Sequence, residues 1–390
     1  MNLLIAVYYS VNTKTMRAVT VFLLFFAKVY SQECTLDVSD PASPMIVTLD
    51  LKFPSFSNDQ SFSFKHNDLF YIMCPRGTQS PYISSETGDE AACREGTEIL
   101  VISTVAVADF GAIKCRPNAV TTVTTSDEPC ANNNGVMFEV GFNVSKSFLS
   151  SVKICFDKNK LTPIYCTNNH DISPTRRDAD PNYYQMFVCN GTDCGWADGG
   201  SLYDTINVDD VYENQEEILK KLGIDKVESQ LVKFPLTTAL WHLNVANNGQ
   251  QIRKAPFYDY INVVPAWNTD TFNKLLQTLD TTLGDNEFVG DVVRMGTFGV
   301  ATLPNSGGDE VELFLGEGKI PVPKWIWMNY DKKEQVLFYY NHPDPDQSET
   351  AIADMCSKYN DLNTSVFTCL YESVVDPDMK NLIDNDFNNN

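Results

Sequence analysis

Positive charge is scarce in this sequence. Its 390 residues include 29 Lys and Arg against 51 Asp and Glu, so the formal net charge is -22 at pH 7. Proteins that hold a nucleic-acid backbone usually neutralise its phosphates with Lys and Arg. The composition therefore argues against a general attraction to phosphates. A phosphate-binding role would need a local basic patch within an acidic body.

Short metal-binding motifs are absent as well. The chain has no Cys-x-x-Cys pair and no His-Glu-x-x-His motif, which argues against a cysteine-ligated zinc site. Eleven cysteines are nevertheless present, and in an exported chain we expect them to form disulfides. Three pairs are close enough in sequence to bridge locally, and the odd count leaves one thiol over. These pairs are Cys155/Cys166, Cys189/Cys194 and Cys356/Cys369.

Long hydrophobic runs are missing except near the N-terminus. The run 19–27 follows a basic residue, is too short to span a bilayer, and precedes small residues at a cut between Ser31 and Gln32. Residues 1–31 are therefore expected to be a signal peptide, with Met16 as an alternative initiator; the less favoured alternative is an uncleaved anchor. The sequence predicts a secreted, extracellular protein that does not contact a membrane after cleavage.

Asn-x-Ser/Thr sequons agree with export, because N-glycosylation occurs on the surface of secreted chains. We expect glycosylation at Asn143, Asn190 and Asn363.

The first part of the mature chain alternates apolar and polar residues in short runs, as at 62–73 and 98–110. This period is typical of strands, and no long helical period interrupts it. We therefore expect a β-rich, disulfide-containing N-terminal module at 32–170. A second domain is expected at 171–375, followed by a polar, disordered tail at 376–390.

The second domain mixes helical and extended patterns. Residues 209–223 have apolar side chains on one side of a helix, with Gly223 suited to its end. Alternation at 292–304 and 324–342 predicts strands, and 350–360 reads as a short helix.

The stretch 231–283 organises the interpretation of function. An apolar strand is expected at 239–245 with His242 on it, a turn follows, and a second strand at 257–264 is ended by Pro265. An amphipathic helix then begins near Asp270. Its apolar stripe is Phe272, Leu275, Leu276, Leu279 and Leu283. Strand, turn, strand and helix, with one histidine on the first strand, is the outline of a ββα-metal nuclease core.

Longer motifs carry a resemblance to a known family. They are INVVPAW at 261–267, GTFGVATLP at 296–304, ELFLGEGKIPVPKWIW at 312–327 and FYYNHPDPD at 338–346. With these motifs the chain resembles the secreted DNA/RNA non-specific endonucleases of insects. Within that family it looks most like the salivary endonuclease-like proteins of tsetse flies.

The resemblance implies an α+β fold with a ββα-metal (His-Me finger) endonuclease core and a central antiparallel sheet, preceded by the β-rich module. It also implies DNA or RNA as a partner and a divalent cation, Mg²⁺, as cofactor. In such a core a neutral histidine takes a proton from water, and the cation binds a phosphate oxygen and the leaving oxygen.

The family pattern places His242 where the general base belongs. It also exposes a departure, because Leu240 and Trp241 stand where the family has arginine and glycine. An arginine at that place offsets charge on the five-coordinate phosphorus, and a glycine allows close approach to the phosphate.

The metal positions are altered too. The family places an asparagine on the helix and a glutamate eight residues later. Here Asn273 is followed by Asp280 at seven residues, which rotates the acid by about 100° around the helix. A second register puts Thr271 at the asparagine position, with Leu279 or Asp280 after it.

Each candidate site residue also fits an ordinary structural role. His242 on an apolar strand also fits a hydrogen-bonded core histidine, and Asn273 in the first helical turn fits a capping side chain. Asp280 also fits an exposed helix carboxylate. Arg253 and Lys254 fit either a phosphate-facing basic patch or an exposed loop.

Three functions are consistent with these residues. The first is an endonuclease-like protein that binds nucleic acid with weak or lost phosphodiester hydrolysis. The second is an active Mg²⁺-dependent endonuclease in which Arg253 replaces the missing arginine. The third is a non-enzymatic, secreted ligand-binding protein on a nuclease scaffold, which the net charge of -22 favours.

Overall fold

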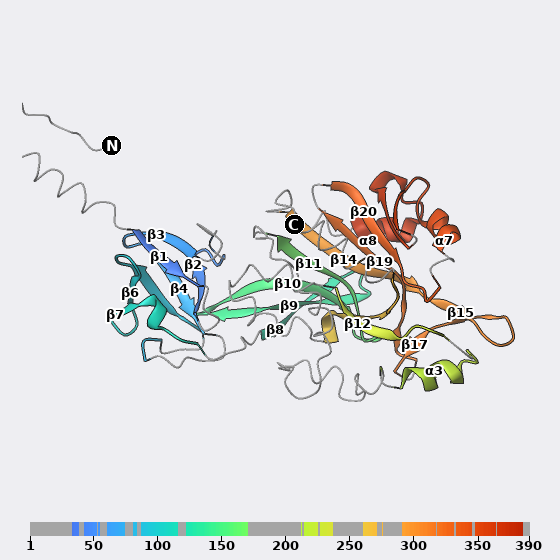
Figure 1. Cartoon of the computed structure of the whole chain (residues 1–390), viewed down its shortest axis with the longest axis horizontal. Coiled ribbons are helices and arrows are strands. Elements are labelled where there is room, and N and C mark those ends of the chain that lie inside the picture. Colours follow the sequence, from blue (N-terminus) through green and yellow to red (C-terminus); the bar gives the residue numbers. More distant parts are fainter. Residues whose placement is uncertain are drawn as a thin grey trace, which may run out of the picture.

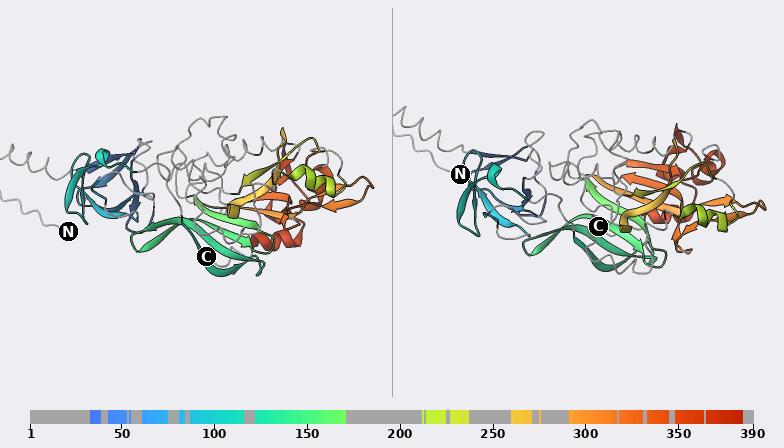
Figure 2. Two further views of the ribbon diagram at one scale, coloured as in Figure 1. Left: turned by 90° about the horizontal axis from the view of Figure 1, so that it is seen from below. Right: turned by 60° about the horizontal axis from the view of Figure 1, so that its bottom comes forward.

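The computed structural model describes residues 33–38, 43–52, 54, 61–74, 81–83, 87–115, 122–170, 212, 214–224, 227–236, 260–270, 275, 291–316, 318–330, 333–344, 348–363 and 365–384. The described elements form an elongated arrangement. An N-terminal module, blue in Figures 1 and 2, occupies one end, and the later strands and helices, orange and red, occupy the other.

The N-terminal module is an antiparallel β structure with its own core. Its elements are β1 (Glu33–Asp37), β2 (Met45–Thr48), β3 (Ser61–Lys65), β4 (Leu69–Met73), β5 (Asp89–Cys93), β6 (Glu98–Val101), β7 (Ala106–Asp109) and the 3-10 helix η1 (Phe110–Ala112). One sheet has the order β2-β4-β5-β6-β7, and β1 pairs with β3. Alternation decides which side chains enter the core, as in β1, where Cys34 and Leu36 are buried between exposed neighbours.

A nine-stranded antiparallel sheet forms the larger body. Its order is β21-β22-β20-β19-β14-β11-β10-β9-β8. The strands are β8 (Thr122–Cys130), β9 (Gly135–Val144), β10 (Ser147–Asp157), β11 (Thr162–His170), β14 (Asp291–Val300), β19 (Pro323–Tyr330), β20 (Lys333–Tyr340), β21 (Asn360–Asn363) and β22 (Val366–Leu370). Figure 1 shows the green strands beside the orange ones.

This sheet corrects the expected boundary at residue 170. β11 pairs with β14 from Tyr165↔Gly296 to His170↔Asp291, so strands from both sides of that boundary share one sheet. Alternation along a strand reveals its two faces, but it does not reveal which distant strand lies beside it. The described part of the N-terminal module ends at Cys115, and the body begins with β8.

Two separate apolar layers cover the two faces of the nine-stranded sheet. In β19, Ile326 and Met328 belong to one core, while Trp325 and Trp327 belong to the other. The helices α7 (Ser348–Met355) and α8 (Pro377–Asp384) cover the tryptophan face. The expected strands at 292–304 and 324–342 are confirmed in β14, β15, β19 and β20.

The C-terminal helices correct two expectations. The predicted helix at 350–360 corresponds to α7, but α7 ends at Met355 and residues 360–363 form β21. The tail expected to be disordered from 376 contains α8, in which Met379 and Ile383 are buried. These two side chains are four residues apart, so they lie on one helix face and pack against the sheet.

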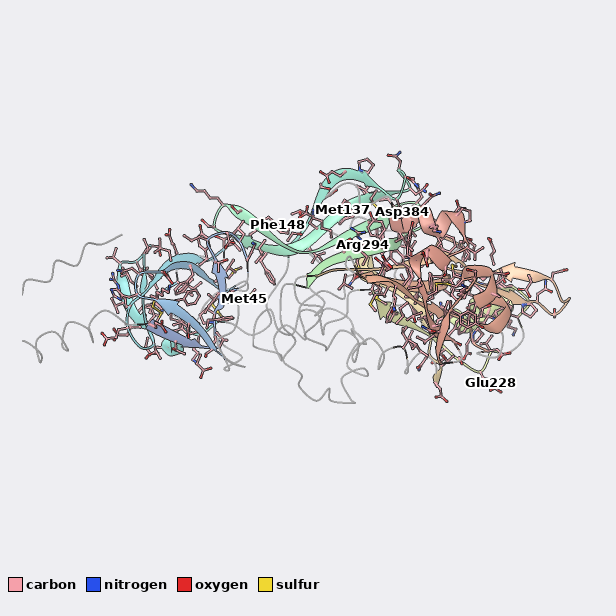
Figure 3. The ribbon with its side chains drawn as sticks, turned by 90° about the horizontal axis from the view of Figure 1, so that it is seen from above. Met45, Met137, Phe148, Glu228, Arg294 and Asp384 are labelled. Atoms are coloured by element: carbon pink, nitrogen blue, oxygen red, sulfur yellow. A yellow bond between two sulfur atoms is a disulfide. The ribbon has the colours of Figure 1, made fainter. Side chains whose placement is uncertain are left out.

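A long hairpin joins the body to the module. β9 and β10 pair along their length, and at their turn the Ser145 N–H donates to the Thr87 carbonyl at 2.8 Å. Val144 of the hairpin shares a core with Met45 and Met73 of the module. Figure 3 labels Met45 on the module and Phe148 on the hairpin that reaches it.

Smaller elements complete the body. They are α3 (Gln215–Lys221), β12 (Leu231–Pro235), η4 (Tyr260–Asn262), β13 (Val263–Trp267), β15 (Thr302–Pro304), β16 (Glu310–Glu312), β17 (Phe314–Leu315), β18 (Ile320–Pro321) and η7 (Tyr371–Ser373). The expected helix at 209–223 is confirmed over Gln215–Lys221, which form α3. Gly223, at φ +77°, follows its last turn, and the Ile224 N–H donates to the Leu219 carbonyl at 3.0 Å, which closes the helix end.

Four disulfides join described cysteines, namely Cys34–Cys93, Cys74–Cys115, Cys130–Cys155 and Cys356–Cys369. The expected Cys356/Cys369 pair is confirmed, and the expected Cys155/Cys166 pair is wrong. Cys166 is a free thiol whose pKa is raised by its burial in the core. The Cys189/Cys194 pair lies outside the described residues. No helix in the described ranges is long and apolar enough to cross a membrane.

Candidate functional site

Strands β12 and β13 form the described framework of the candidate site. They pair antiparallel from Leu231↔Trp267 to Pro235↔Val263. The expected strand end at Pro265 is wrong, because Pro265 lies inside β13 opposite Lys233. A two-stranded sheet leaves one side of each strand without a ladder, and a proline that donates no N–H is tolerated there.

A buried glutamine holds the beginning of β12. Gln215 of α3 is 8% exposed, and its Nε2 donates to the carbonyls of Tyr212 at 2.8 Å and Leu231 at 3.1 Å. Its Oε1 accepts from the Leu231 N–H at 2.6 Å. Both ends of the amide are thus satisfied, which a buried polar group requires. The contact fixes α3 against the strand pair.

A buried asparagine holds β13 against the nine-stranded sheet. The Asn341 side chain is fully buried, and its Oδ1 accepts from the Trp267 N–H at 2.9 Å. Its Nδ2 donates to the carbonyls of Pro265 at 3.1 Å and Pro323 at 2.8 Å. One amide therefore joins β13 to the start of β19 and the end of β20.

The segment with the candidate general base begins and ends at neighbouring points of this framework. Beyond the β12–β13 ladder, the Leu236 N–H donates to the Asn262 carbonyl at 2.8 Å. Residues 237–259 leave and rejoin the framework there, and His242, Arg253 and Lys254 belong to this segment. All three, with Leu240 and Trp241, lie outside the described residues.

The candidate metal ligands follow β13 on a helix that the structure describes in part. Asp270 and Leu275 are helical, and Leu275 is fully buried in the same core as Trp267. This agrees with the expected helix start and with one member of its apolar stripe. Asn273 and Asp280 lie outside the described residues.

The described residues offer no metal site of their own. Within these ranges no three His, Cys, Asp or Glu side chains lie close enough together to hold a metal ion. The fit of Mg²⁺ therefore rests on the donor set proposed from the sequence, in which an amide and a carboxylate suit a hard cation.

His342 is a structural histidine. Its ring stacks on Tyr340 with centroids 5.3 Å apart, and its Nδ1 lies 2.9 Å from the carbonyl oxygen of Asp344. Burial lowers the pKa of His342, against the opposing effect of Asp344 and Glu310.

The roles of Gln215 and Asn341 as anchors were not predicted from the sequence. Gln215 is a polar residue on the apolar side of the expected helix, which is a signal for a buried, bonded amide. Asn341 lies in the motif FYYNHPDPD directly after an apolar run. Nothing in the sequence predicts its three hydrogen-bond partners.

The structure describes the three glycosylation candidates to different extents. Asn143 lies in β9 with an exposed side chain. Asn363 is the last residue of β21, with a side chain outside the described set, and Asn190 lies outside it altogether.

Comparison with known proteins identifies a relative. The chain is 23% identical over 313 residues to the salivary endonuclease of Lutzomyia longipalpis, a match that covers 74% of this chain and 69% of that protein. The chain is therefore a distant relative of a salivary endonuclease, which confirms the resemblance seen in its motifs. No family model matches it.

Among solved structures, the EndoG/EndoGI complex aligns with a TM-score of 0.30 and 12% identity, over 60% of this chain and 80% of that one.

Proposed function

We propose that this protein is a secreted, endonuclease-like nucleic-acid-binding protein with weak or lost phosphodiester hydrolysis. The observation that carries the proposal is the tetrapeptide Ala239-Leu240-Trp241-His242 in a chain related to a salivary endonuclease. His242 matches the histidine of the family pattern, while apolar Leu240 stands in place of its arginine and the larger, apolar Trp241 in place of its glycine. The proposed core for this site is ββα-metal.

The substitutions act on the transition state more than on binding. Without an arginine at 240, charge that develops on the phosphorus is not offset, a loss of about 3 kcal/mol or roughly a hundredfold in rate. Trp241 would also fill space where the family's glycine admits the phosphate. His242 would remain the general base of any residual reaction.

We assign nucleic-acid binding to residues 237–259, the segment between strands β12 and β13. Arg253 and Lys254 would contact backbone phosphates, and Asn273 with Asp280 would hold Mg²⁺ where hydrolysis survives. When bound, this cation would stabilise negative charge on a phosphate oxygen. In support, Gln215 and Asn341 fix both strands that flank residues 237–259.

The test measures binding and cutting of plasmid DNA and double-stranded RNA, with Mg²⁺ or chelator, across a salt series. We expect salt-dependent binding with little cutting. Replacing Arg253 and Lys254 by Ala should lower the slope of log K against log salt by about 2, since each phosphate contact contributes about 0.9. Lys146→Ala, at the exposed hairpin turn, is the matched control.

A gain-of-function variant sharpens the test. Leu240→Arg with Trp241→Gly should raise chelator-sensitive cutting by roughly a hundredfold, and His242→Ala should abolish that gain. If the wild type already cuts, and His242→Ala stops it, the protein is an active Mg²⁺-dependent endonuclease. If it neither binds nor cuts nucleic acid, the proposal fails in favour of a ligand-binding role.

Secretion and glycosylation belong to the same proposal. The mature chain should begin at Gln32, and glycans should occupy Asn143, Asn190 and Asn363. Sequencing the secreted N-terminus and mapping sites by mass spectrometry after glycosidase treatment would check both.

A further inference from the structure

A small pocket with a mixed polar and apolar lining lies at the open edge of the nine-stranded sheet, where β21, β22 and β20 meet. Its volume is about 130 Å³, and its lining includes Lys358, Tyr359, Asn360, Thr368, Leu370 and Ser373. None of these residues belongs to the stretch 231–283 that carries the proposed function. The pocket is therefore a feature separate from the candidate hydrolytic segment.

Three constraints shape the pocket before any ligand arrives. The disulfide Cys356–Cys369 joins the segment before Lys358 to the strand that forms the floor. The Ser357 N–H and its hydroxyl both donate to the Ser373 carbonyl, at 2.9 and 3.2 Å. Beyond them, β21 pairs with β22. A preformed pocket loses little entropy on binding.

The lining favours an anionic ligand that has a ring. No lining residue is acidic, which is notable in a chain of net charge -22, and Lys358 supplies a positive charge. Thr368, Ser373 and Asn360 add hydrogen-bonding groups. The Tyr359 ring is 41% exposed and rests edge-on against Phe367, with centroids 5.7 Å apart. It can offer a face for stacking while its contact with Phe367 holds it in place.

The volume sets the size of the ligand. A cavity of about 150 Å³ in another protein holds one benzene molecule, so this pocket accommodates one ring-sized group. A base inside a duplex is stacked and paired, and it would have to be flipped out to enter. Single strands expose their bases, and stacking on aromatic side chains is their usual mode of recognition.

We propose that this pocket receives the base of one unpaired nucleotide of a single strand, stacked on Tyr359, with the phosphate of that nucleotide bound by Lys358. The inference rests on the proposed function, because it supplies a subsite for the same nucleic-acid ligand. It also narrows the substrate class, since it favours strands with an unpaired end or loop over perfect duplexes.

The experiment uses the full mature chain and three probes. These are UMP, an oligothymidylate of about 12 nucleotides, and the same strand paired with its complement. Tyr359→Ala should weaken single-strand binding roughly tenfold, while Tyr359→Phe should retain it. Lys358→Gln should lower the single-strand salt slope by about 0.7. Lys380→Gln on α8 is the matched control, because Lys380 is not in the lining.

The outcomes separate this inference from the proposed function. If Tyr359→Ala and Lys358→Gln, shown to be folded by thermal melting, bind single strands and UMP like the wild type, the pocket assignment is overturned. Binding through Arg253 and Lys254 would be untouched by that result. If long nucleic acids do not bind, but UMP binds and Tyr359→Ala removes it, the proposed function fails and the pocket stands as a mononucleotide site. No binding of any probe overturns both.

Discussion

At the scale of single residues, Asn341 has the largest structural consequence for the candidate site. Its amide satisfies a donor on Trp267 and acceptors on Pro265 and Pro323, all in the interior. Removing one partner of a buried hydrogen bond leaves the other without water or protein contact, at a cost of about 1 kcal/mol or more each. This side chain therefore fixes strand β13, which follows the segment proposed to bind nucleic acid.

Asn341→Ala should therefore lower the free energy of unfolding by about 3 kcal/mol. Urea denaturation followed by tryptophan fluorescence measures the change. Asn341→Asp should also destabilise the protein, because it keeps the acceptor for Trp267 but loses both donors. Gln230→Ala, an exposed change beside the same strand pair, is the control and should be nearly neutral. A midpoint for Asn341→Ala equal to that of the control would show that the three bonds contribute nothing.

The sequence predicted less at this scale than at any other. His242, Asn273 and Asp280 were proposed from a family pattern, and they remain proposals because they lie outside the described residues. Asn341 and Gln215 were missed as anchors, since a polar residue shows its partners only when the fold brings them together. The Cys155/Cys166 pairing failed for the same reason. The register puts Tyr165, not Cys166, opposite Cys155, and the partner of Cys155 is Cys130 on the other side.

At the scale of elements, strand alternation was a reliable guide. The runs at 62–73, 98–110 and 292–304 contain strands in the structure, because period-two burial is a local property of the chain. The order of strands was not predictable. The pairing of β11 with β14 joins residues on either side of 171–211, and no local pattern encodes that partnership.

The polar composition of the C-terminal tail led to a wrong prediction at helix α8, where disorder was expected. The polar residues around it resemble a disordered tail, but Met379 and Ile383 together supply an apolar face for the tryptophan side of the sheet.

Truncation after Asp376 should destabilise the protein by about 4 kcal/mol, since burying each of the two side chains contributes roughly 2 kcal/mol. Truncation after Asp384 should leave stability unchanged. Urea midpoints of the two shortened chains provide the comparison. Ile383→Ala alone should cost about 2 to 4 kcal/mol, and the exposed Asn381→Ala should cost little. Equal midpoints for both truncations would mean that α8 does not contribute to the core.

At the scale of the whole molecule, the described ion pairs do not organise the fold. The pairs Lys52–Asp50 and Lys221–Glu217 join exposed groups, and exposed pairs contribute little stability. The net charge of -22 instead bears on function, because any nucleic-acid contact must be local and will weaken steeply with salt.

Apolar cores and disulfides divide the molecule into two units. The N-terminal module has its own core and two bridges, with sequence separations of 59 and 41 residues. In the loop-entropy description, closing loops of this length stabilises a fold by about 4 kcal/mol each. A small β module has limited apolar area to bury, so it depends strongly on such bridges. The body relies on two large apolar layers, and among the described residues the β9–β10 hairpin meets the module.

Replacing Cys74 and Cys115 by Ala should therefore unfold the module while the nine-stranded sheet persists. Hydrogen exchange followed by mass spectrometry should show loss of protection across β4 to β7, with β14, β19 and β20 still protected. Cys166→Ala is the control, because it changes a buried cysteine without removing a bridge. Simultaneous loss of protection in both units would show instead that the hairpin, whose Val144 shares a core with Met45 and Met73, couples them into one cooperative unit.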